Sequence, residues 1–84
     1  MKPIRFTKHA RARCAARGAA ESEVVQSIRE GNLEPAAHGK LMYRANFRYN
    51  GTWQGTHYAI KQIAAVVAED RDSLVVVTVY TFYF

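Results

Sequence analysis

Three nitrogen-bearing side chains recur at four-residue intervals near the start of the chain: His9, Arg13 and Arg17. If this segment is helical, residues four apart lie on one face, so the three side chains form a row. Two guanidinium groups can grip phosphate oxygens in a fork, and an imidazole can move a proton near neutral pH. The spacing therefore predicts a site that binds a phosphodiester and acts on it.

The same row has a structural interpretation. Like charges four residues apart on a helix repel one another, so the fold or a ligand must compensate them. Glu21 and Glu23 follow in the sequence and could pair with Arg13 and Arg17, which would tie two helices together. An anionic ligand is the other source of compensation, and the sequence leaves both open.

Other basic side chains extend the candidate surface. Arg44 and Arg48 alternate on one face of a predicted strand, where they could follow a nucleic-acid backbone or simply be solvated. In the segment from Trp53 to Gln62, Trp53 or Tyr58 could stack a base, or these aromatics could pack the sheet. The nucleic-acid contacts expected from the sequence are Lys8, Arg11, Arg44, Arg48 and Lys61.

Tyr80 is a weaker candidate for the chemistry. A phenol can in general donate a hydrogen bond or a proton. Tyr80 also belongs to an alternating run with Phe82 and Phe84, which favours an ordinary strand aromatic, and Thr78 would lie on the same face. The catalytic set predicted from the sequence is His9, Arg13, Arg17 and Tyr80.

The charge and the composition indicate which partners and which kinds of site the protein could have. The net charge is +5, with six basic residues and no acid in residues 1–20, and four basic residues and no acid in residues 35–68. Clustered Lys and Arg attract phosphate polymers, although a soluble basic surface without a partner is the alternative. A single cysteine, Cys14, excludes an internal disulfide. His38 and His57 show no metal-ligand spacing with His9 or Cys14, so neither a metal nor a cofactor is expected.

The chain begins without an apolar run typical of a signal peptide, and its most apolar segment, Leu74 to Val79, is far shorter than a membrane span of ~20 residues. We therefore expect a soluble cytoplasmic protein without membrane contact. A length of 84 residues allows one domain, residues 1–84.

The elements that position these residues can be read from capping and periodicity. Pro3 to Phe6 is predicted as an edge strand. Helices are predicted over Lys8 to Arg17, with Thr7 as its N-cap and Gly18 after its end, and over Glu21 to Glu30. Ala10 and Cys14 lie beside the basic row and should contact the core.

The second half of the chain alternates as strands do. A loop is expected from Asn32 to Gly39, then a strand over Leu41 to Tyr49 and a hairpin turn at Asn50-Gly51. Further strands are expected at Thr52 to Lys61, Gln62 to Ala68 and Leu74 to Phe82, the last at the centre of the sheet. Together these elements predict an α+β domain with two N-terminal helices on one face of a small antiparallel sheet.

The pattern T-K-H-A-x-x-R-x-x-x-R-G, from Thr7 to Gly18, resembles the signature of a family of small bacterial domains of unknown function, which look like relatives of the RelE and BrnT ribonuclease toxins. The resemblance continues through ESEVVQSI and VVVTVY. Ala19 and Ala20 depart from it, since the family tends to have a branched apolar residue and a capping Ser there, so the second helix should be less firmly packed and capped.

The resemblance implies a RelE-like fold and RNA cleavage, with RNA, free or on the ribosome, and an acidic antitoxin as partners. In this chain His9 would transfer the proton, while Arg13 and Arg17 would stabilise the phosphate. The rival interpretation is a binding module without catalysis, whose basic surface holds nucleic acid or an acidic protein.

Overall fold

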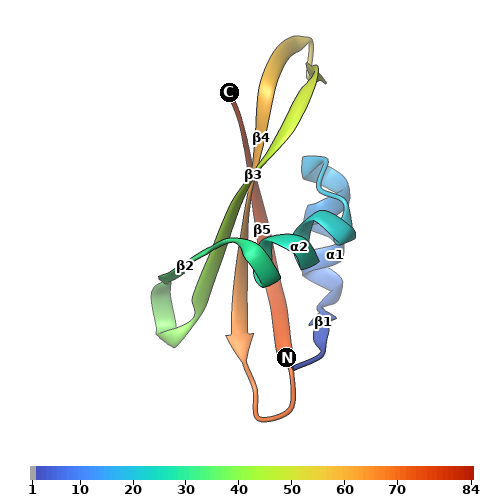
Figure 1. Ribbon diagram of the computed structural model, residues 1–84. Coiled ribbons are helices and arrows are strands. Elements are labelled where there is room, and N and C mark those ends of the chain that lie inside the picture. The colour runs from blue at the N-terminus through green and yellow to red at the C-terminus, as the bar shows by residue number, and fades with distance from the viewer. Residues whose placement is uncertain (1) are drawn as a thin grey trace.

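Two helices precede the long strands in the chain, as the sequence predicts. The computed structural model describes residues 2–84. In chain order its main elements are β1 (Ile4–Phe6), α1 (Lys8–Arg17), α2 (Glu21–Glu30), β2 (Asn32–Pro35), β3 (Leu41–Trp53), β4 (Thr56–Glu69) and β5 (Leu74–Tyr83). The strands form one sheet in the order β1-β5-β4-β3-β2, and both helices lie on the same side of it (Figure 1).

Local chemistry explains where each helix begins and ends. The Thr7 side chain accepts a hydrogen bond from the Ala10 N–H at 3.0 Å, and Gly18 ends α1 in the left-handed conformation with φ 73°. Ala20 at the start of α2 has no side chain that can cap it. Glu23 compensates, because its Oε1 accepts the Ala20 N–H at 3.0 Å. The predicted helix bounds are confirmed.

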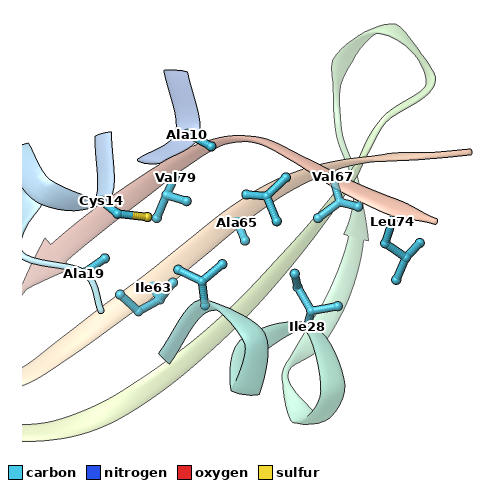
Figure 2. Packing of buried hydrophobic residues seen from close by; sticks show 11 residues of the cluster. Ala10, Cys14, Ala19, Ile28, Ile63, Ala65, Val67, Leu74 and Val79 are labelled. Carbon is cyan, nitrogen blue, oxygen red and sulfur yellow. The ribbon is translucent and has the colours of Figure 1, made fainter. Parts of the chain in front are cut away.

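The core lies between the helices and one face of the sheet (Figure 2). Helix α1 packs against β5, and α2 packs against β4 and β3. As predicted, Ala10 and Cys14 are the buried residues of α1. They meet a row of buried aliphatic residues on the sheet, and α2 adds two more; the cluster includes Val24, Ile28, Ile63, Ala65, Val67, Leu74, Val76 and Val79.

The sheet is mixed, so the prediction of a purely antiparallel sheet is wrong in one respect. Strand β1 pairs with β5 in the parallel direction, through Ile4 with Leu74 and Phe6 with Val76. These two strands come from opposite ends of the chain, so no hairpin constrains their relative direction. β5 is an inner strand between β1 and β4, as expected, but the central strand is β4.

The hairpin turn is not at Asn50-Gly51. Strand β3 continues to Trp53, and the chain reverses at Gln54 and Gly55, which have φ of 49° and 86°. Positive φ at both central residues is typical of the tight turns that favour β-hairpins. Asn50 also has a positive φ of 46°, and the register with β4 shifts there, so its signal marks a bulge rather than a reversal.

Two further boundaries differ from the prediction. The expected loop from Asn32 to Gly39 contains the edge strand β2, which pairs antiparallel with β3 before a short 3-10 turn at Ala37–Gly39. Pro35 ends this strand, where its missing N–H costs no ladder bond. The strands expected at Thr52 to Lys61 and Gln62 to Ala68 are not separate, because β4 continues through Lys61 and Gln62 without a break. Gly55 lies in the turn before β4 and so does not interrupt it.

A bulge in β5 reverses which side chains face the helices. Val66 pairs with Thr78 while Val67 pairs with Val76, so Val77 is an extra residue. Side chains alternate between the faces of a strand, and one extra residue shifts that alternation. Val76 and Val79 consequently both face the core. The residues that alternate with Val79, from Thr78 onward, lie on the face of the sheet that no helix covers.

Candidate active site along α1 and β5

Helix α1 runs beside the part of β5 that β1 leaves free. In the described chain, β1 pairs with β5 only over Leu74–Val76. From there α1 borders the strand. The Thr7 N–H donates to the Val76 carbonyl at 3.1 Å, and Arg17 Nη1 donates to the Val79 carbonyl at 2.8 Å. The side chains of one face of α1 therefore lie along the edge of β5.

The predicted row on α1 forms, and two side chains of β5 join it. Arg13 Nε lies 3.4 Å from His9 Nε2, and Thr78 Oγ1 lies 3.5 Å from the same nitrogen. The Arg17 guanidinium lies 4.9 Å from the centre of the Tyr80 ring. These five side chains bring together a possible base, a hydroxyl, a phenol and two cations, which is the composition that phosphodiester chemistry needs.

Two donors lie near the same nitrogen of His9. The Arg13 N–H can donate to Nε2 only when that nitrogen keeps its lone pair. Thr78 competes for the same lone pair at a longer distance. Both His9 and Arg13 are exposed, so a ligand could reach them from solvent.

Acidic side chains do not compensate the row. Glu21 pairs with Arg11 at 3.2 Å and Glu23 pairs with Lys61 at 2.8 Å, so neither acid takes the role that the structural interpretation gave it. Within residues 2–84, no carboxylate lies at ion-pair distance from His9, Arg13 or Arg17. The row is therefore a cluster of positive charge that the fold leaves available to an anion.

The end of the row is rigidly held. The Arg17 carbonyl accepts hydrogen bonds from Thr81 Oγ1 and from the Tyr83 hydroxyl, each at 2.9 Å. The Tyr83 ring in turn stacks on Trp53 with centroids 4.9 Å apart. Burial of Tyr83, with a contribution from Tyr49, raises the pKa of its phenol, so it remains a neutral donor. The strand thus fixes the last turn of α1, and Arg17 with it.

The remaining candidates are distributed over three places. Lys8 is exposed on α1. Arg11 is held by Glu21 and lies 5.6 Å from the Phe6 ring centre. Arg44 and Arg48 lie on the helix-free face of the sheet. Lys61 is on the opposite face, where only 8% of the residue is exposed.

Lys61 has two partners at close range. Its Nζ lies 2.8 Å from Glu23 Oε1 and donates to the Gly18 carbonyl at 2.9 Å. It also lies 5.4 Å from the Tyr49 ring centre. The amine is therefore fully paired between helices and sheet and is not free to bind a phosphate.

Two other features lie apart from the row. An open hollow of about 370 Å³ lies where α2 meets β3 and β2; its lining residues include Glu30, Asn32, Arg44 and Phe47. Cys14 is buried in the core, and this burial raises the pKa of its thiol, so it is an unreactive packing group, as expected.

In the described part of the chain, no helix is long and apolar enough to cross a membrane, and no three His, Cys, Asp or Glu side chains are placed to share a metal ion.

Thr78 belongs to the candidate site but not to the catalytic set predicted from the sequence. In an unbroken strand it would face the core together with Val76, because the two are two residues apart. The bulge at Val77 turns it to the other face, beside His9. A polar residue within an otherwise aliphatic run was the available signal, but only the pairing with β4 reveals the bulge.

Three long antiparallel strands, a short parallel edge strand and a helix pair with a basic face define a small α+β domain with a candidate anion site. The sequence model of one family, described as Domain of unknown function (DUF4258), matches residues 6–81. The chain belongs to this family. The match includes the whole of α1 and β5 as far as Thr81, and therefore every residue of the candidate site. No curated protein and no solved structure matches the chain.

Proposed function

We propose that this protein is a RelE/BrnT-like ribonuclease domain whose active site is the row of His9, Arg13 and Arg17 together with Thr78 and Tyr80. The observation that carries the proposal is the convergence of these side chains from two distant segments without an acidic partner. Exposed cations that a fold leaves uncompensated are suited to an anionic ligand, and a neutral imidazole beside them can accept a proton.

The reaction would be attack of a ribose 2′-oxygen on the adjacent phosphorus. The 2′-oxygen loses its proton to His9 Nε2 and bonds to phosphorus, while the bond from phosphorus to the 5′-oxygen breaks. The Tyr80 phenol supplies the proton that the leaving 5′-oxygen needs. The products are a 2′,3′-cyclic phosphate and a free 5′-hydroxyl, so atoms and charge balance without a metal or cofactor.

Substrate binding would also switch the role of Arg13. In the free protein its N–H holds the lone pair of His9 Nε2. A phosphate competes for this guanidinium, because a charge-assisted bond to an anion is stronger than one to a neutral ring. Once Arg13 turns to the phosphate, Nε2 is free to act as the base. Arg17, fixed by Val79 and Tyr80, would stabilise the charge that develops on the phosphorane oxygens.

A binding module without catalysis is the second candidate. It is favoured by the occupied lone pair of His9, which leaves no free base in the unliganded protein. In that case the same row would hold phosphate groups, and an acidic protein could compete for it. The toxin assignment further predicts an acidic antitoxin that covers the row and blocks RNA.

Cleavage by matched histidine variants tests the proposal. His9→Ala should lower the rate of RNA cleavage at least ~10²-fold, which is the low end of the effect of a proton-transfer group. His57→Ala is the control, because His57 is an exposed histidine on the distant hairpin. Binding of a 2′-O-methyl RNA, which cannot be cleaved, should persist in both variants. If the purified wild-type protein binds RNA but leaves it intact, or if His9→Ala cleaves at the wild-type rate, the ribonuclease assignment fails.

A further inference from the structure

The helix-free face of the sheet carries an ordered set of side chains that the proposed active site does not use. Residues directly opposite one another on β3, β4 and β5 share a face, and they form three cross-strand rows. The rows are Arg44–Ala64–Tyr80, Asn46–Gln62–Phe82 and Arg48–Ile60–Phe84. Basic or amide side chains thus lie along β3, and aromatic rings lie along β5.

The aromatic residues of this face on β5 are exposed to solvent, although the residues next to them in the sequence face the helices. Tyr80, Phe82 and Phe84 are 41%, 46% and 58% exposed. The residues that alternate with them, Thr81 and Tyr83, face the helices and use their hydroxyls on the Arg17 carbonyl. The bulge at Val77 is what produces this inverted arrangement, in which phenylalanine faces solvent and threonine faces the helix. Bulges that redirect side chains are common beside functional sites.

Cations and amides border the aromatic row. The Arg44 guanidinium lies 5.7 Å from the Phe82 ring centre and donates to Gln62 Oε1 at 2.9 Å. It is also ion-paired with Glu34 at 3.0 Å, so it orders this face and is not free for a phosphate. Gln62 in turn donates to Asn46 Oδ1 at 2.8 Å. Arg48 is exposed on the same face. Tyr80 is shared, because the Arg17 guanidinium of the candidate site lies over its ring.

We propose that this face is a platform for single-stranded RNA, on which bases stack on Tyr80, Phe82 and Phe84 while Arg48 holds a phosphate. The proposal rests on the proposed ribonuclease function and extends it, since it defines the substrate as unpaired RNA and places the strand along β5. Tyr80 joins the platform to the row, because the Arg17 guanidinium lies over its ring and Thr78, two residues earlier on β5, lies beside His9. A strand bound on Phe82 and Phe84 would therefore lead to the proposed cleavage site.

Spacing and chemistry favour RNA over a protein on this face. Alternate residues of a strand are ~6.7 Å apart, about twice the ~3.4 Å rise of stacked nucleotides, so each ring would receive one splayed base. Only unpaired RNA can splay its bases in this way. The three rings lie along a single strand, β5, and guanidinium and amide groups border them. A guanidinium group can bind a phosphate, and an amide can hydrogen-bond to a base edge. A protein interface would need a broader apolar centre.

Binding of an uncleavable strand tests the platform without requiring cleavage. The probe is a labelled ten-nucleotide 2′-O-methyl oligouridine, compared with the same strand annealed to oligoadenosine. Phe82→Ala should weaken binding of the single strand about tenfold, the scale of one lost base–aromatic contact. Phe82→Leu keeps an apolar side chain and should lose a similar amount. Leu33→Ala is the control, because Leu33 is 57% exposed on β2, opposite Tyr43, which packs on the helix side.

Salt dependence separates stacking from charge. Phe82→Ala should leave the slope of log affinity against log salt unchanged, while Arg48→Gln should make it shallower by about 0.7. Wild-type affinity for the duplex should be much lower than for the single strand. Equal affinity for both forms would overturn the platform, as would unchanged single-strand affinity in both Phe82 variants.

The outcome for the platform can be distinguished from that for the proposed function. If both Phe82 variants bind and cleave RNA as the wild type does while His9→Ala is inactive, the ribonuclease stands and the platform fails. If the wild type sediments as a dimer that Phe82→Ala dissociates, with RNA affinity unchanged, the face is a self-association surface and the platform is likewise overturned.

Discussion

Lys61 and Arg13 both carry a positive charge near α1, but only the charge of Lys61 has an acidic partner. Lys61 lies beneath the helices, where Glu23 and the Gly18 carbonyl satisfy its amine. Arg13 lies at the border of β5, where its only polar partner among residues 2–84 is the ring of His9. One charge is enclosed by the chain, and the other faces solvent without a counter-charge.

This difference indicates which charge maintains the structure and which is available for a ligand. Removing one partner of a buried ion pair leaves the other charge desolvated, so Lys61 should matter for stability. An exposed cation contributes little to stability, so Arg13 should matter only when an anion binds.

Lys61→Ala should lower the free energy of unfolding by about 3 kcal/mol, because Glu23 and the Gly18 carbonyl lose their partner in a largely buried place. Urea unfolding followed by circular dichroism measures the change. Combining Lys61→Met with Glu23→Gln should recover much of the loss, since no uncompensated charge remains. A single substitution with a cost below ~0.5 kcal/mol would mean that this contact resembles a surface ion pair.

Gly18→Ala should cost about 2 kcal/mol, because the residue has φ 73° and a Cβ there would approach the Trp53 ring to 2.6 Å and the Tyr83 hydroxyl to 2.7 Å. The same assay measures it, with Gly39→Ala as a control. Gly39 also has a positive φ, but a Cβ there meets nothing within 4 Å. Equal losses at the two positions would show that backbone strain alone acts, and that the contact between α1 and the hairpin is unimportant.

His9→Ala and Arg13→Gln should each change stability by less than ~0.5 kcal/mol, as expected for exposed side chains without a buried partner. Thermal unfolding of each variant beside the wild type measures the effect. If either variant unfolds the domain or costs as much as Lys61→Ala, the row is part of the scaffold and the comparison with Lys61 is lost.

Stability should also fall slightly at alkaline pH, from about pH 9 upward. Burial raises the pKa of the Cys14 thiol and of the Tyr83 phenol above their ordinary values of 9.0 and 10.0. The unfolded chain therefore releases these protons at lower pH than the folded protein does, and stability is lost as pH rises through that window. Cys14→Ala should remove the earlier part of the decline. An unchanged profile in this variant would assign the decline to other groups.

The sequence was sufficient to predict the helices and their buried contacts. Thr7 and Gly18 specify the ends of α1, and the spacing of Ala10 and Cys14 specifies its buried side, because these signals act within a few residues. The row of His9, Arg13 and Arg17 follows from the same local geometry. Its stated alternative, pairing with Glu21 and Glu23, depended on tertiary packing that the sequence alone does not reveal.

The strands were harder to predict because their boundaries depend on partners distant in sequence. Asn50-Gly51 favours a turn locally, yet pairing with β4 continues beyond it and the reversal occurs at Gly55. The bulge at Val77 is similarly invisible without its partner strand, although it places Thr78 beside His9 and Tyr80 beside Arg17. Sequence reasoning therefore predicted the row on α1 of the candidate site, but not which β5 side chains lie beside it.

The salt dependence of RNA binding tests most directly whether the row on α1 is the phosphate-binding site. The comparison is between Arg13→Gln with Arg17→Gln and a control of equal charge, Arg29→Gln with Arg71→Gln. Both control residues are exposed and lie outside α1, one in the last turn of α2 and one between β4 and β5. For the uncleavable single strand, we predict that the first double variant has a slope shallower by about 1.4, two phosphate contacts at ~0.7 each, while the control keeps the wild-type slope. Equal slopes in the two double variants would contradict the account, because RNA would then respond to net charge and not to this row.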